Sequence, residues 1–144
     1  FDRFINSTDQ TYTDRFGQEK PTVKGLMPDL GAYMPARMTI KTVTLTSDPT
    51  YHLVLSDALS YIRFIIGSGS TALCYVPLNA DVNFEIGHQI NIVQAGTAQV
   101  LITCTQGVTV NKAETHKTRK QGSIVTLIKV GTDEWDLIGD TEAA

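Results

Sequence analysis

Short apolar runs alternate with polar connections along most of this chain. From Thr39 onward the runs are rich in Val, Ile, Thr and Tyr, and Gly, Ser, Asn and Asp separate them. Such runs are typical of β-strands joined by tight turns. The pattern predicts eight or nine strands, over residues 38–47, 51–56, 61–66, 71–76, 89–95, 98–104, 108–110, 122–130 and 134–138.

The apolar positions in these runs have a period of two, so we expect one face of each strand to be buried. The clearest cases are Val43 with Leu45, Leu53 with Leu55, Ile62 with Phe64 and Ile66, Val100 with Ile102, and Ile124 with Ile128 and Val130. Glycine-containing turns at 67–70, 95–97 and 131–133 separate consecutive runs. They predict three β-hairpins.

Helix is expected only in two short stretches, 29–37 and 56–61, and Pro28 and Pro35 confine the first. Because no helical period separates the strands, the spacing favours an antiparallel β-sandwich or jelly roll over a parallel α/β sheet. We predict an extended leader or attachment segment over 1–37 and a β-sandwich domain over 38–144.

The leader is polar and rich in turn residues. Its sizeable apolar side chains follow no steady period: Phe1, Phe4, Ile5, Tyr12, Phe16, Val23, Leu26, Met27, Leu30, Tyr33 and Met34. Burying so few side chains does not offset the conformational entropy lost by ordering the segment. We expect the leader to need a surface from its own domain or from another chain, with a flexible tether as the alternative.

Composition excludes several classes of protein. With 144 residues, 42% of them hydrophobic, the chain is long enough for one domain and an appendage. Its net charge of -3 does not favour binding to nucleic acid or to an anionic membrane. No apolar run approaches the roughly 18 residues that a membrane-spanning helix needs. The chain begins with Phe1 and not Met, so we expect a segment before it.

The two cysteines, Cys74 and Cys104, lie in alternating apolar runs. This position is typical of small buried residues, and it favours free thiols over a disulfide. Such thiols suit assembly in a reducing cytosol.

Two blocks of sequence resemble bacteriophage tail-fibre and receptor-binding tail proteins. The leader reads TYTDRFG from Thr11 and KPTVKG from Lys20, which is similar to a T-x-R-x-G...P-T-x-x-G segment of such fibres. The second block reads IGHQINIVQAG from Ile86, GVTVN from Gly107, KTRKQGSIVTLIK from Lys117 and GTDEWDLIGD from Gly131. It resembles a small β-domain that recurs in virion appendages, and the W-D-L-I-G run is its most specific part.

The resemblance implies a structural virion protein, commonly a homotrimer, that is assembled in the bacterial cytoplasm and located in the tail. Its implied partners are other tail proteins and a host polysaccharide or envelope receptor. It does not imply an enzyme, a nucleic-acid partner or insertion into a membrane. A carbohydrate-binding module and a capsid decoration protein are the alternatives.

Candidate metal chemistry is limited to Asp81, Asn83 and Glu85, which alternate as at the start of a calcium loop. Such a loop needs glycine at its sixth position and a carboxylate at its twelfth, where Ile86 and Ile92 stand. The segment is better interpreted as a solvated connection, and we predict no metal or cofactor site.

Candidate catalytic chemistry is equally weak. His52, Ser56 and Asp57 are close in sequence, but no G-x-S-x-G motif accompanies them. His88 and His116 lie in polar, turn-like stretches and are interpreted as surface residues. We predict no catalytic residue.

Carboxylates that flank a sugar would serve a glycan depolymerase, and Asp133, Glu134 and Asp136 are the nearest match. Alternation turns Glu134 and Asp136 away from the face of Trp135 and Leu137, so we expect a solvated strand. No repeat of 20 or more residues, as in the solenoid enzymes of tails, is visible.

The one basic cluster lacks the interleaved aromatic residues of a single-strand binder. It consists of Lys112, His116, Lys117, Arg119 and Lys120, with Glu114 among them. We interpret it as a solvated loop, with an anionic bacterial glycan as the alternative partner. Trp135 shares its parity with Leu137, so we expect this sole tryptophan in the core instead of stacked on a sugar.

Overall fold

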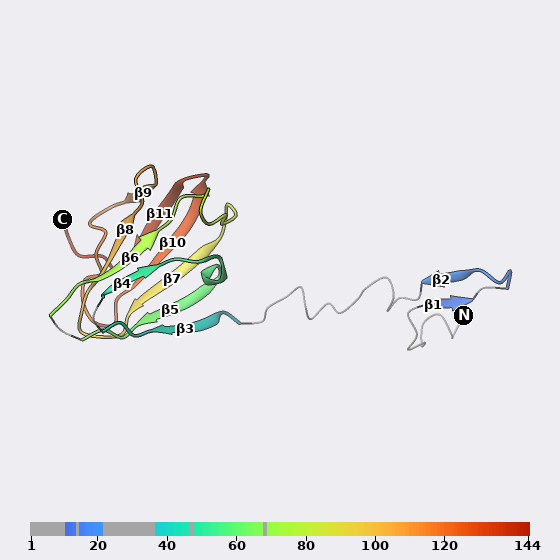
Figure 1. Ribbon diagram of the computed structural model, residues 1–144, viewed down its shortest axis with the longest axis horizontal. Helices are drawn as coiled ribbons and strands as arrows, with labels where there is room; N and C mark the ends of the chain where they lie inside the picture. Colours follow the sequence, from blue (N-terminus) through green and yellow to red (C-terminus); the bar gives the residue numbers. More distant parts are fainter. Residues whose placement is uncertain (1–10, 14, 22–36, 47, 68) are drawn as a thin grey trace. The chain divides into compact units, whose positions relative to one another are not determined.

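The computed structural model describes residues 11–13, 15–21, 37–46, 48–67 and 69–144. The chain divides into two units, Phe1–Arg37 and Met38–Ala144, and each is described by itself. Their strands are coloured along the sequence in Figure 1. The possible helix over 29–37 lies almost entirely outside the described residues.

The first unit contains a short antiparallel hairpin, β1 (Thr11–Thr13) and β2 (Glu19–Pro21), in which Tyr12 pairs with Lys20. Gly17, with a φ of 76°, supplies the left-handed turn between them. No strand was predicted in the leader, because strands of three residues are too short to display a period of two.

The second unit contains the nine predicted strands. They are β3 (Thr39–Val43), β4 (Thr50–His52), β5 (Ser60–Phe64), β6 (Ala72–Val76), β7 (Gln89–Gln94), β8 (Val100–Cys104), β9 (Thr109–Lys112), β10 (Ile124–Gly131) and β11 (Glu134–Gly139). A 3-10 helix over Leu55–Asp57 falls close to the stretch where a turn of helix was expected. The location of the strands is therefore confirmed.

The arrangement of these strands is a mixed, largely parallel β-solenoid of about four turns. One sheet has six strands in the order β3-β5-β7-β10-β11-β9, and the other has three in the order β4-β6-β8. Successive strands from β3 to β8 alternate between the two sheets, so the chain coils around a core enclosed by both (Figure 1). The predicted antiparallel sandwich or jelly roll is wrong.

Parallel pairing explains the error. Strands β3, β5 and β7 are parallel to one another, as are β4, β6 and β8. Each parallel connection here crosses through a strand of the opposite sheet, where an α/β protein would use a helix. The absence of helices therefore did not require an antiparallel sheet, because alternating strands look the same in both arrangements.

Two of the three predicted hairpins are instead corners of the solenoid. The turns at 67–70 and 95–97 each carry the chain from the six-stranded to the three-stranded sheet. The third turn does join an antiparallel hairpin, β10–β11. At the second corner a Cβ on Gly96 would lie 2.2 Å from the backbone oxygen of Ile66, so neighbouring coils approach too closely for any side chain there.

The core fills the space between the sheets. Ile62, Phe64, Val100 and Ile102 are buried as predicted, and so is Cys74. Cys104 is half-buried, and both cysteines are free thiols. Burial raises the pKa of Cys74, which makes its thiol unreactive.

Two strands bury a different set from the one expected. Leu55 is exposed, since the 3-10 helix ends the alternation after Leu53. In β10 the inward side chains are those of Val125, Leu127 and Lys129, whereas Ile124 and Val130 are exposed: 42% and 40% of their surface is accessible. The parity predicted for β10 is therefore wrong, and a lysine occupies a core position.

Candidate functional site

Asp57 is a fully buried carboxylate at the end of the 3-10 helix. Its Oδ1 accepts a hydrogen bond from Lys41 Nζ at 2.8 Å. Its Oδ2 accepts one from the Tyr51 hydroxyl at 2.8 Å and one from the Val54 N–H at 2.9 Å. Lys41 also donates to the Tyr51 hydroxyl. Both oxygens of this carboxylate therefore accept hydrogen bonds from groups of the protein itself.

The charges of this network are fixed by its geometry. Burial lowers the pKa of Lys41, but its hydrogen bonds to Asp57 and Tyr51 outweigh burial and raise that pKa above the ordinary 10.5. Burial raises the pKa of Tyr51 above the ordinary 10.0. An ammonium group and a neutral phenol therefore face the carboxylate at neutral pH.

The structure does not bring His52, Ser56 and Asp57 together. Alternation along β4 turns Tyr51 toward the core, where its ring packs edge-on against Phe64, and turns His52 to the opposite face. There the His52 ring stacks on Tyr75, with centroids 4.9 Å apart and planes 17° apart. Ser56 is exposed.

The carboxylates that sequence reasoning considered are also dispersed. Asp81, Asn83 and Glu85 are exposed in the connection before β7. Among the residues that the structure describes, no group of three or more His, Cys, Asp or Glu side chains is placed to hold a metal ion. His88 Nδ1 accepts a hydrogen bond from the Glu85 N–H at 3.2 Å, and its ring packs edge-on against Phe84. His116 Nε2 lies 3.2 Å from the Val110 oxygen.

The acidic residues of the last hairpin all accept hydrogen bonds from asparagine N–H groups. Asp133 Oδ1 accepts the N–H of Asn79 at 2.7 Å. Glu134 and Asp136 each accept a hydrogen bond from the Asn111 side-chain amide at 2.9 Å. They lie on the face opposite Trp135, which is 1% exposed, so the predicted burial of this tryptophan is confirmed.

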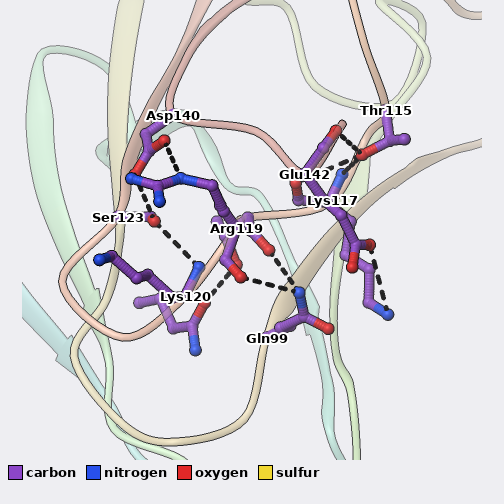
Figure 2. A network of polar contacts seen from close by, with 10 residues as sticks. Gln99, Thr115, Lys117, Arg119, Lys120, Ser123, Asp140 and Glu142 are labelled. Atoms are coloured by element: carbon purple, nitrogen blue, oxygen red, sulfur yellow. Dashed lines mark hydrogen bonds and ion pairs between the residues drawn. The ribbon is translucent and has the colours of Figure 1, made fainter. Parts of the chain in front are cut away.

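Two residues of the basic cluster, Arg119 and Lys117, are paired with acidic residues of the C-terminal segment (Figure 2). Arg119 makes a bidentate contact with Asp140, at 2.6 Å from Nε and 2.9 Å from Nη2, and Ser123 donates to the same carboxylate at 2.7 Å. The bond from Arg119 holds the pKa of Asp140 below its ordinary value. Lys117 Nζ lies 3.8 Å from Glu142. Acidic partners thus offset the charge of two of its four Lys and Arg side chains, which weakens the case for a polyanion partner.

The outer face of the six-stranded sheet is the strongest candidate for an interaction surface. The strand register places five residues in one row across it: Ile40, Tyr61, Asn91, Thr126 and Ile138. The isoleucines at the ends of this row are 71% and 54% exposed. A pocket of about 240 Å³ borders the row and is lined by Met38, Leu59, Gln89 and Asn91.

The outer face of the three-stranded sheet has a different character. His52, Tyr75 and Thr103 are directly opposite one another on adjacent parallel strands. His52 is exposed, and β4 is an edge strand in the described part of the chain. An aromatic ring at a polar sheet edge is a surface on which a sugar or another ring can stack. Sequence reasoning missed both faces, because the row partners come from strands whose order it did not predict.

No protein-family model matches the sequence, and no curated protein shows significant similarity to it. The class of protein is therefore defined by the fold alone, a short β-solenoid closed by an antiparallel hairpin. In the described residues no helix is long and apolar enough to cross a membrane.

Proposed function

We propose that this chain is a structural component of a tailed-phage virion, a tail fibre or fibre adaptor that acts in tail assembly and host attachment. The observation that carries the proposal is the place of the W-D-L-I-G run, which resembles tail-fibre proteins. It forms β11, the closing strand of a β-solenoid. A solenoid extends by adding coils along one axis, and this suits an element of a fibre.

Immunogold labelling of intact particles with antibodies raised against residues 38–144 tests this role. Label on the tail is the expected result. Label confined to the head would favour the decoration protein instead, and purified particles without label would contradict a virion role altogether.

Carbohydrate recognition is a second candidate, favoured by the stacked rings of His52 and Tyr75 on the outer face of the three-stranded sheet. A glycan array separates it from a purely structural role. A connector gives no reproducible binding, whereas a recognition module gives binding that a His52→Ala variant loses.

We further propose that three copies assemble through the outer face of the six-stranded sheet. Ile40 and Ile138 expose apolar surface at the two sides of this face, and covering such surface favours association. Light scattering after size-exclusion chromatography should give three times the single-chain mass of 15.8 kDa at micromolar concentration.

An Ile40→Asp, Ile138→Asp double variant should weaken this association, because it places carboxylates within the apolar contact. We expect a loss of at least tenfold in trimer affinity, measured by the same method at decreasing concentration. Ile86→Asp is the matched control, since Ile86 is 68% exposed but lies outside the strands. A wild-type monomer, or equal effects of both variants, would contradict the proposed interface.

A further inference from the structure

Lys129 occupies a core position beside the only tryptophan of the sequence. It is 2% exposed, it pairs with Trp135 across the β10–β11 hairpin, and its Nζ lies 5.7 Å from the centre of the indole ring. Phe84 packs edge-on against that ring at 5.3 Å. Lysine is almost never buried so completely unless it is paired.

The hydrogen-bond acceptor for this amine is an amide side chain. Lys129 Nζ donates to Asn79 Oδ1 at 2.5 Å. The carbonyl carbon, Cγ of Asn79, is one bond beyond that oxygen. The backbone N–H of Asn79 is in turn held by Asp133 Oδ1 at 2.7 Å. The β10–β11 hairpin and the connection after β6 thus bring an amine, a carboxylate and a carboxamide together.

The amine is also closer to its reactive form than an ordinary lysine. Burial lowers the pKa of Lys129, although the negative charge of Asp133 acts in the opposite direction. The neutral amine is the nucleophile in reactions of lysine with carbonyl groups. The neighbouring indole ring keeps water from one side of the buried amine, and the fixed contact with Asn79 favours attack on the adjacent carbonyl carbon.

We propose that Lys129 and Asn79 form an intramolecular isopeptide bond. The lone pair of Nζ attacks Cγ of Asn79, the new C–N bond forms, and the bond from Cγ to Nδ2 breaks. One proton of the attacking amine passes to Nδ2, which leaves as ammonia. The products are a secondary amide and ammonia, and nothing is oxidised or reduced. We assign the proton transfer to Asp133.

The bond would join the connection that follows β6 to strand β10, and so tie the second coil of the solenoid to the closing hairpin. A covalent link between positions far apart in sequence restricts the unfolded chain, as a disulfide does. It needs no oxidising compartment. This inference does not depend on the proposed virion role.

Mass spectrometry of the purified full chain tests the proposal. The intact mass should fall below the sequence mass by one ammonia. Because trypsin needs a free lysine amine, it should fail to cut after Lys129, and the digest should contain a branched peptide that joins Asn79 to Lys129. An unmodified mass with normal cleavage after Lys129 would overturn the proposal. So would ammonia loss without the branched peptide, since an asparagine succinimide has the same mass.

Variants assign the roles. Lys129→Met and Asn79→Ala should restore the full mass, whereas Asn83→Ala, which changes an exposed amide of the same connection, should keep the loss of ammonia. Asp133→Asn retains an acceptor for the Asn79 N–H but not the proton transfer. We expect the cross-linked fraction of this variant to grow at least tenfold more slowly in samples taken during expression. Growth at the wild-type rate would show that Asp133 does not transfer the proton.

Discussion

Replacing Trp135 with alanine should lower the free energy of unfolding by about 3 to 5 kcal/mol, which is the usual cost of deleting a buried large aromatic side chain. Trp135 is among the largest fully buried side chains of the described residues. Its ring contacts Phe84 at 5.3 Å and lies beside Lys129, so its removal leaves a cavity in contact with an amine. Urea denaturation followed by circular dichroism measures the change.

The matched control is Ile86→Ala, because Ile86 is 68% exposed and its truncation should shift stability by no more than about 0.5 kcal/mol. The wild-type protein offers an independent check. As the sole tryptophan, Trp135 should emit at the blue-shifted wavelength of a buried indole. Emission typical of an exposed indole, or equal costs for the two variants, would contradict its burial.

The sequence revealed where the strands lie but not how they are ordered. Alternation and turn residues locate strands because both are local properties. Order depends on which strands pair, and a corner such as 95–97 uses the same residues as a hairpin. Unequal coils also concealed the repeat: Thr39 pairs with Ser60, but Tyr61 pairs with Asn91. The longer second coil contains the connection that carries Phe84 and Asn79.

The candidate sites could not be predicted because they contain buried residues whose polar side chains indicate exposure in the sequence pattern. In β10 both alternating sets of residues contain apolar side chains, so the period of two cannot distinguish the buried face from the exposed one. The set that contains Lys129 therefore looked like the solvent-exposed set, although it is the buried one. Asp57 was considered only beside His52, its neighbour in sequence. Its actual partner Lys41 is brought close by parallel pairing of β3 with β5. Buried polar residues are where sequence reasoning is expected to fail.

Asp57→Ala should lower the free energy of unfolding by about 3 kcal/mol. The substitution leaves the Lys41 ammonium, the Tyr51 hydroxyl and the Val54 N–H without their common acceptor, and unpaired buried donors are costly. We place the estimate at the lower end of the range of about 3 to 5 kcal/mol for a broken buried pair, because the Lys41 side chain is 36% exposed and can recruit water.

The pH dependence of stability distinguishes this network from simple loss of packing. Lys41 and Tyr51 both have a pKa raised by folding, so the unfolded chain loses its protons first as pH increases. Their contribution is complete below about pH 10 and declines as pH rises through the folded-state values. Urea titrations from pH 8 to 11 should show this decline in the wild type and a shallower one in Asp57→Ala. Asp81→Ala, an exposed carboxylate, is the control and should follow the wild type. Parallel curves for all three proteins would mean that Asp57 does not couple the two groups to folding.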